Sequence, residues 1–146
     1  MSGVRPLPDG YRLSFDQDEA DARAAHAYLT RSYWSPGIPL ETVTRAMAGS
    51  LCCTVHRDGA QIGMARLITD YTTFGYLADV YVLEEHQGQG IAQAMVSAIL
   101  ARPDLAGLRR WMLFTRDAHT LYAKLGFTGL AHPERAMLRD NPDVYR

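Results

Sequence analysis

Residues 79–92 read DVYVLEEHQGQGIA and join an apolar stretch to a helix-like stretch through a glycine-rich turn. The β-branched and aromatic residues 80–82 favour a strand, whereas residues 91–101 contain neither Gly nor Pro and favour a helix. Glycine at positions 88 and 90 frees backbone N–H groups at the positive end of that helix's dipole. We therefore expect this corner to bind a phosphate or a pyrophosphate.

Two common phosphate-binding motifs do not fit this turn. A Walker loop needs Lys and then Ser or Thr after its last glycine, but Ile91 and Ala92 follow Gly90. The dinucleotide fingerprint needs a third small residue at position 93, which is Gln. What fits is Gln87-x-x-Gly90-x-Ala92, and a second block, AHTLYAKLGF at residues 118–127, follows about thirty residues later.

Turn signals divide the chain into short strands and helices. The pair Asp58-Gly59 predicts a two-residue hairpin turn, and Asp16 with Glu19 predicts the start of a helix that runs to about residue 31. Strands are expected at residues 11–15, 51–56, 60–68, 74–82, 110–114, 127–130 and 136–138, with further helices at 40–48, 91–101 and 118–125. The order β-α-α-β-β-β-α-β-α-β-β predicts one α+β domain with a mixed central sheet flanked by helices.

Composition excludes several classes of protein. A chain of 146 residues has room for one domain, and 15 basic against 16 acidic residues give no surface for nucleic acid or membrane. No apolar run approaches the roughly 20 residues of a membrane span, and residues 1–9 contain no signal-peptide core. Cys52 and Cys53 are adjacent, so on a strand they face opposite ways and have no metal-ligand spacing. We expect a reduced, cytoplasmic protein without a metal.

The ordered pair of blocks resembles the motifs of the GNAT N-acetyltransferases, and the resemblance covers residues 11–138, the expected core of a single domain spanning residues 1–146. It implies the same order of elements and transfer of an acetyl group from acetyl-CoA to a primary amine. By the same resemblance the cofactor-binding residues are Val80, Tyr81, Val82, Gln87, Gly88, Gln89, Gly90, Ile91, Ala92 and Thr115.

The resemblance gives these residues different roles. The backbone of residues 80–82 would bond the pantetheine arm and the thioester carbonyl, and the loop would bind the pyrophosphate. The family often has Arg or Lys in this loop, whereas Gln87 and Gln89 bring no charge, so weaker cofactor affinity is expected. Thr115 stands where the family commonly has Asn, and a hydroxyl replaces only one of the amide's hydrogen bonds.

Two residues are candidates for proton transfer. By resemblance Tyr122 protonates the departing thiolate, and an ordinary phenol pKa of about 10 suits a thiolate of roughly 8–9; the alternative is a tyrosine that only packs or positions. Asp79, at the start of the cofactor strand, is a candidate general base or amine ligand. The alternative for Asp79 is a hydrogen bond to nearby backbone or to Arg66.

The residues expected to bind the acceptor amine form a weaker sequence pattern than the cofactor motifs. By resemblance Tyr33 and Trp34 form one wall of the acceptor pocket, where they would favour an apolar or aromatic amine or a cation held against a ring; the alternative is a loop anchor. Arg66 is expected to add a polar contact.

Three functions remain open at this stage. The first is an acetyl-CoA-dependent N-acetyltransferase that acts on a small molecule by direct transfer, without a cysteine relay because Cys52 and Cys53 are distant in sequence from the thioester region. The second is a non-catalytic acyl-CoA-binding or sensing module, and the third is a protein N-acetyltransferase, which would need an open, acidic groove. Residues 137–146 could pair in a homodimer.

Overall fold

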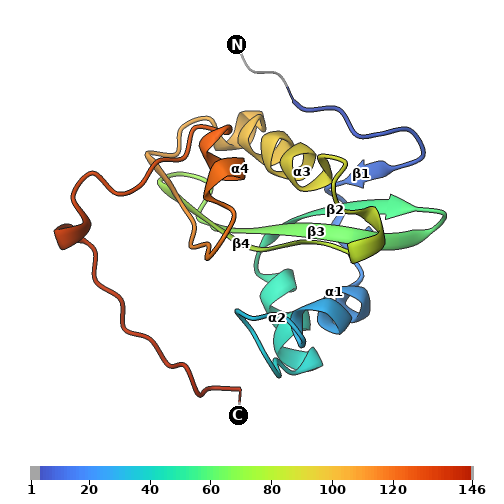
Figure 1. The fold of residues 1–146 in the computed structure, drawn as a ribbon, viewed down its shortest axis with the longest axis horizontal. Coiled ribbons are helices and arrows are strands. Elements are labelled where there is room, and N and C mark those ends of the chain that lie inside the picture. Colours follow the sequence, from blue (N-terminus) through green and yellow to red (C-terminus); the bar gives the residue numbers. More distant parts are fainter. Residues whose placement is uncertain (1–3, 146) are drawn as a thin grey trace.

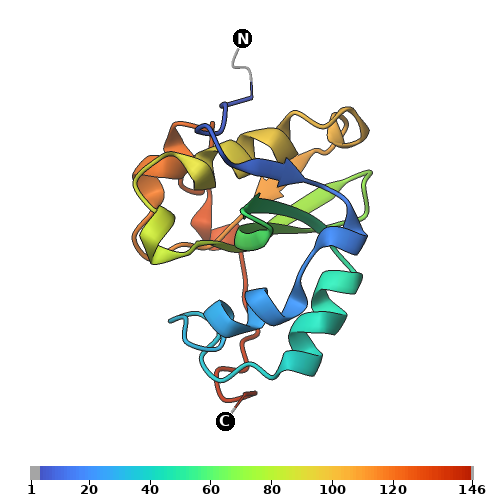
Figure 2. The same ribbon diagram turned by 90° about the vertical axis from the view of Figure 1, so that its right-hand side faces the viewer.

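A mixed five-stranded sheet separates two helical layers in the computed structural model, which describes residues 4–145 (Figure 1). The strand order is β1-β2-β3-β4-β5, and every neighbouring pair is antiparallel except β4 and β5, which are parallel. Helices α3 and α4 lie on one face of the sheet, and α1 and α2 lie on the other (Figures 1 and 2). Residues 1–3 and 146, which belong to the terminal segments considered above, lie outside the described residues.

The elements have these bounds. The strands are β1 (Arg12–Ser14), β2 (Leu51–Arg57), β3 (Ala60–Thr69), β4 (Phe74–Val82) and β5 (Arg110–Met112). The helices are α1 (Ala22–Leu29), α2 (Leu40–Ala48), α3 (Ile91–Leu100) and α4 (His119–Ala123). Short 3-10 turns occupy Gln17–Glu19, Glu84–His86, Pro103–Leu105 and Pro133–Arg135.

The central hairpin and the strand–loop–helix unit confirm the sequence-based predictions. Asp58 and Gly59 join β2 to β3 with φ values of 52° and 81°, the left-handed conformations that a two-residue hairpin turn requires. β4 ends at Val82 and α3 begins at Ile91, as the glycine-rich turn indicated.

The first helix does not begin where the sequence suggested. Asp16 caps only the 3-10 turn Gln17–Glu19, and the chain then passes through Ala20 and Asp21 in extended conformation. Asp21 caps α1 itself by accepting a hydrogen bond from the Ala24 N–H at 3.0 Å. Two competing caps therefore divide what the pattern presented as one helix.

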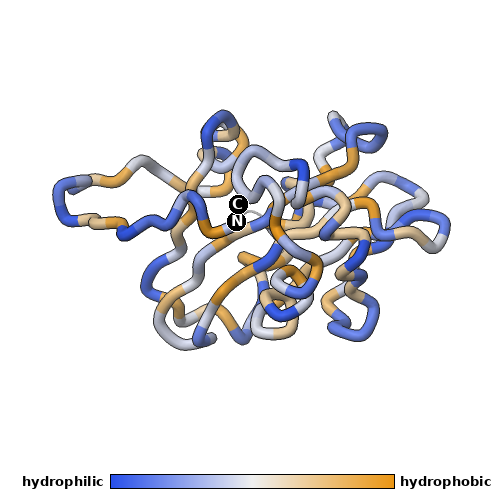
Figure 3. The backbone as a smooth tube through the Cα atoms, turned by 90° about the horizontal axis from the view of Figure 1, so that it is seen from below, coloured by the Kyte–Doolittle hydropathy of each residue, from blue (hydrophilic) through white to orange (hydrophobic). Residues whose placement is uncertain are grey.

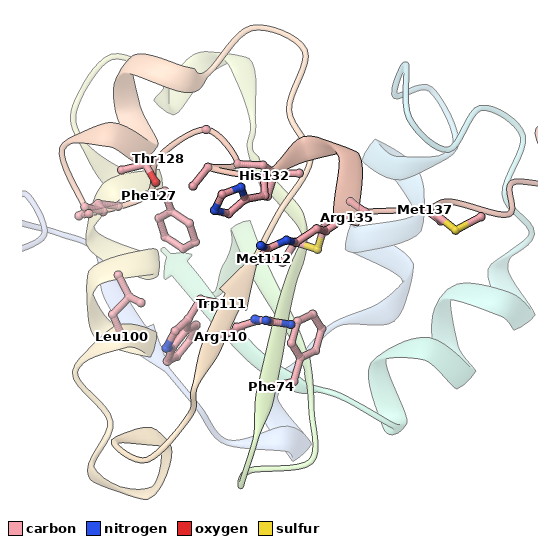
Figure 4. A pocket seen from close by; sticks show the side chains of 16 residues that line it. Phe74, Leu100, Arg110, Trp111, Met112, Phe127, Thr128, His132, Arg135 and Met137 are labelled. Atoms are coloured by element: carbon pink, nitrogen blue, oxygen red, sulfur yellow. The ribbon is translucent and has the colours of Figure 1, made fainter.

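The last two predicted strands are wrong, because residues 127–130 and 136–138 form no strand. Gly129 and the 3-10 turn at Pro133–Arg135 interrupt the segment, and Met137 is 98% exposed. β5 is also shorter than predicted and ends at Met112. A cavity of about 710 Å³ separates the segment from β5; Phe127 and His132 lie on one side of it, and Leu100 and Trp111 on the other (Figure 4).

Two hydrophobic clusters fill the space on either side of the sheet. The cluster under α3 includes Cys53, Leu67 and Met95, and the cluster against α1 and α2 includes Cys52 and Met64. Cys52 and Cys53 are both free and buried, and they face opposite sides of β2 as predicted. Figure 3 shows hydrophilic residues gathered in the peripheral turns.

A β-bulge interrupts the regular pairing of β4 with β3. Met64 pairs with Tyr81 and Arg66 pairs with Ala78, so Asp79 and Val80 together oppose the single residue between Met64 and Arg66. Asp79 has φ 55°, a left-handed conformation that Asp tolerates better than most residues. On its other side β4 pairs with β5 only from Phe74 to Tyr76. The second half of β4 therefore has a free side, where the candidate site lies.

The close approach of β3 to β4 at Gly63 gives a test of this packing. A Cβ at Gly63 would lie 2.9 Å from the Tyr81 carbonyl oxygen, so Gly63→Ala should lower the free energy of unfolding by about 1–3 kcal/mol. Gly107→Ala is the matched control, because no atom lies within 4 Å of its Cβ position. Urea unfolding measures both, and equal stability of the two variants would contradict the packing described.

Candidate active site

Two cavities occupy the gap between the second half of β4 and the segment that leads from β5 into α4. The loop cavity, of about 710 Å³, is lined by the glycine-rich turn and the start of α3. The aromatic cavity, of about 560 Å³, is lined by Tyr33, Trp34, Tyr76, Phe114 and Tyr122 together with Arg66 and Asp79. The cavities share one wall, formed by Tyr33, Trp34, Val80, Arg116, Asp117, Ala118 and Tyr122. A molecule in one cavity can therefore meet a molecule in the other.

The start of α3 leaves backbone donors free beside the loop cavity. Gly88 and Gly90 have φ values of 82° and 81°, and Gly90 is the residue that caps the helix. Among residues 4–145, nothing accepts a hydrogen bond from the N–H groups of residues 91–93. Unpaired N–H groups at the positive end of a ten-residue helix fit a pyrophosphate.

The side chains of the two glutamines of the turn bond neighbouring groups, and of the two only Gln87 lines the loop cavity. The Gln87 side-chain amide donates to the Val82 carbonyl at 2.8 Å and ties the turn to the end of β4. The Gln89 amide donates to the Tyr11 hydroxyl at 3.1 Å and to the His86 carbonyl at 3.2 Å. The turn is therefore rigid and uncharged at these positions.

Asp79 lies at the bulge with both carboxylate oxygens occupied. Oδ1 accepts from the Trp34 indole N–H at 3.0 Å, and Oδ2 accepts from Arg66 Nε at 2.9 Å. The side chains of Arg66 and Asp79 are only 13% and 10% exposed, so this ion pair is largely shielded from water. The contact with Arg66, one of the two alternatives open from the sequence, is thus present, and it positions Trp34 as well.

Tyr122 lies where the two cavities meet. Burial, with a smaller effect of the neighbouring Tyr33, raises the pKa of Tyr122 to about 12. Its ring packs edge-on against Phe127, while its hydroxyl bonds no group within the described part of the chain. The phenol therefore keeps its proton at neutral pH and is free to donate it to a bound molecule.

The aromatic cavity brings together the three residues predicted to contact the acceptor: Tyr33, Trp34 and Arg66. It also includes Arg116, which the sequence did not indicate. The Arg116 guanidinium stacks 3.8 Å from the centre of the Tyr33 ring, and its backbone N–H donates to the Tyr33 hydroxyl at 3.1 Å. Tyr76 and Phe114 were missed too, because no motif marks a side chain whose place depends on where two strands separate.

Thr115 does not lie with the other predicted cofactor residues. Its hydroxyl accepts a hydrogen bond from the Ala118 N–H at 3.0 Å, just before α4 begins. It lines the aromatic cavity, whereas the loop cavity is lined by Val80, Tyr81, Val82, Gln87, Gly88, Gly90, Ile91 and Ala92 of the predicted set.

Neither a metal cluster nor a membrane helix is found in the described part of the chain. Residues 4–145 contain no group of three or more His, Cys, Asp or Glu side chains placed to bind a metal ion. No helix among them has the length and apolar character needed to cross a bilayer.

Comparison with known proteins agrees with this geometry. The family model of the acetyltransferase (GNAT) domain matches residues 48–129, more than half of the chain. A crystal structure of a candidate GNAT-family acetyltransferase from Xanthomonas campestris pv. campestris is 44% identical, with a TM-score of 0.90 over 96% of this chain and 99% of that one. The chain therefore belongs to the GNAT acetyltransferase family.

Two further similar proteins have a named acceptor in one case and bound acetyl-CoA in the other. The aminoglycoside N(6')-acetyltransferase type 1 of Stenotrophomonas maltophilia is 32% identical over 74% of this chain and 80% of its own length. A structure from Clostridium acetobutylicum, solved with acetyl-CoA, is 18% identical and has a TM-score of 0.66 over 90% of this chain and 94% of that one. At that identity the second comparison shows the shared fold alone.

The Asp79 network can be tested through stability. Asp79→Ala would leave Arg66 shielded from water without its carboxylate and would place Ala at a positive φ, so we expect a loss of about 3 kcal/mol in the free energy of unfolding. Asp79→Asn keeps an acceptor for Trp34 and tolerates the left-handed conformation, so its loss should be smaller. Denaturant unfolding that ranks Asn level with or below Ala would contradict this account.

Proposed function

We propose that this protein transfers an acetyl group from acetyl-CoA to the primary amine of a small molecule by direct attack. The observation that supports this best is the shared wall of the two cavities, which includes Val80 and Tyr122. A thioester carrier bound by the loop cavity and an amine bound by the aromatic cavity would meet at that wall, so no covalent relay is needed.

The loop cavity fits acetyl-CoA, which supplies the acetyl group and a thiol leaving group. In this proposal the free N–H groups at the start of α3 bind the pyrophosphate, and the backbone of residues 80–82 bonds the pantetheine arm and the thioester carbonyl oxygen. The end of the β4–β5 pairing at Tyr76 supports this role, because it leaves residues 80–82 without a strand partner on the β5 side. The acetyl-CoA in the structurally similar Clostridium acetobutylicum protein also supports it.

Tyr122 is the proposed proton donor to the departing thiolate. Tyr122 lines both cavities, and its hydroxyl bonds no group within the described part of the chain. These two features favour catalysis over the alternative of a non-catalytic acyl-CoA sensor, which needs no free acid at this place.

Asp79 is the proposed organiser of the acceptor pocket. Trp34 and Arg66 each donate one hydrogen bond to its two oxygens, so Asp79 fixes the positions of both side chains. Each oxygen keeps a further lone pair, so a role of Asp79 as general base stays a prediction.

The aromatic cavity favours a small amine with a flat apolar part. Its rings offer stacking surfaces, and its charges balance, since Arg66 and Arg116 oppose Asp79 and Asp117. A protein N-acetyltransferase would need an acidic groove, and a polycationic acceptor would need excess acid, so both are less well suited. The similarity to an aminoglycoside N-acetyltransferase supports the broader class of small-molecule amines.

The function is tested by two measurements on the wild-type protein. Calorimetric titration with acetyl-CoA should show saturable binding, and a thiol-release assay with a panel of primary amines should show turnover that is highest for aryl-alkyl amines. Binding without turnover on any amine would favour the sensor. Turnover only with peptides would favour a protein acceptor.

Replacing the proposed acid should separate chemistry from binding. Tyr122→Phe should lower kcat by about 100-fold or more while the Kd for acetyl-CoA stays within about twofold, since only the proton donor is lost. Because the pKa of Tyr122 is raised to about 12, wild-type kcat should show no loss from its ionisation between pH 8 and 10. Tyr71→Phe, an exposed site on the β3–β4 turn, is the control. Parallel losses of kcat and affinity would instead indicate a structural tyrosine.

A further inference from the structure

The glycine-rich turn has no cation of its own. No Lys or Arg occurs between Val82 and the end of α3, and the two glutamines of the turn are occupied by neighbouring groups. Within the turn itself, a pyrophosphate would meet only backbone N–H groups and roughly half an elementary charge of helix dipole. Two arginines line the loop cavity, but Arg31 is paired with Glu84 and Arg116 stacks on Tyr33.

Arg5 brings a cation to this place from the N-terminal segment, which crosses beside α3 before β1 (Figure 2). The Arg5 backbone N–H donates to Ser97 Oγ on α3 at 2.9 Å, and Ser97 is 8% exposed. The guanidinium packs against Gly90: a Cβ built on that glycine would lie 2.7 Å from Arg5 Nε and 2.9 Å from Nη2. The cation therefore lies directly against the residue that caps the start of α3.

The Arg5 guanidinium has no ion pair among the described residues, in contrast to Arg12, Arg31 and Arg102. Arg12, Arg31 and Arg102 each bind a carboxylate at 2.7–2.8 Å, and the pairing with Arg31 lowers the pKa of Glu84 to about 2. Arg5 has neither an ion pair nor a side-chain hydrogen bond to any residue among 4–145. A cation at the positive end of a helix dipole is unfavourable by itself, and a bound anion would reverse that sign.

We propose that Arg5 binds the pyrophosphate of acetyl-CoA and supplies the positive charge that the turn lacks. Ser97 is the positioning residue, because it holds the Arg5 backbone against α3. This inference rests on the proposed function and adds to it a residue outside the segment 48–129 that the family model matches. A charged guanidinium donates stronger, bidentate hydrogen bonds to phosphate oxygens than the neutral amides of Gln87 and Gln89 would.

The test compares three acetyl thioesters by calorimetric titration. Acetyl-CoA has a pyrophosphate and a 3′-phosphate, acetyl-dephospho-CoA has the pyrophosphate alone, and acetylpantetheine has neither. Arg5→Gln should raise the Kd about tenfold, equivalent to about 1.4 kcal/mol, for the first two and leave it unchanged for the third. Arg5→Lys should keep part of the affinity, and Ser97→Ala should raise the Kd about threefold with the same ligand pattern.

Arg45→Gln is the matched control, since it removes an exposed arginine from α2 on the other face of the sheet. An unchanged Kd for acetyl-CoA in Arg5→Gln would overturn the inference, as would a loss confined to acetyl-CoA, which would assign Arg5 to the 3′-phosphate. An equal loss with all three ligands would show a structural role and overturn it too. Failure of the proposed function is distinct from these results, because the wild-type protein would then bind none of the three thioesters.

Discussion

The separation of β4 from β5 is the constraint on which the rest of the site depends. The two strands pair only from Phe74 to Tyr76, and the bulge at Asp79 shifts the register of β4 against β3 by one residue. The shielded Asp79–Arg66 ion pair holds that bulge from one side, and the indole of Trp34 holds it from the other. Both cavities, and the wall they share at Tyr122, exist because the gap stays open.

Three parts of this gap differ in charge, and the difference determines what each part can bind. The start of α3 offers fixed N–H groups and a helix dipole, which suit the anionic end of a nucleotide carrier. The shared wall offers a protonated phenol and backbone, where charge develops during acyl transfer. The aromatic cavity offers rings and balanced charges, which suit a neutral amine. The site thus changes from anion-binding at the start of α3 to apolar in the aromatic cavity.

Local chemistry explains how much the sequence could predict. Gly88, Gly90 and the pair Asp58-Gly59 require particular backbone conformations, so the turn, α3 and the hairpin were predictable from single positions. The strands expected at 127–130 and 136–138 depend on a distant partner strand, and β5 ends too early to provide one. Recurring motifs named most residues that line the two cavities, and the roles given to these residues stay predictions. The positions of Arg116 and Arg5 were not predictable, because each side chain reaches the site from another part of the fold.

Amide hydrogen exchange with and without saturating acetyl-CoA tests the central claim most directly, because the claim is that a carrier occupies the gap beside β4. We predict slower exchange in residues 80–82 and in residues 88–92, with little change in α2 on the opposite face of the sheet. Unchanged exchange in residues 80–82 at a concentration that saturates binding would contradict the account, since the carrier would then lie outside the gap.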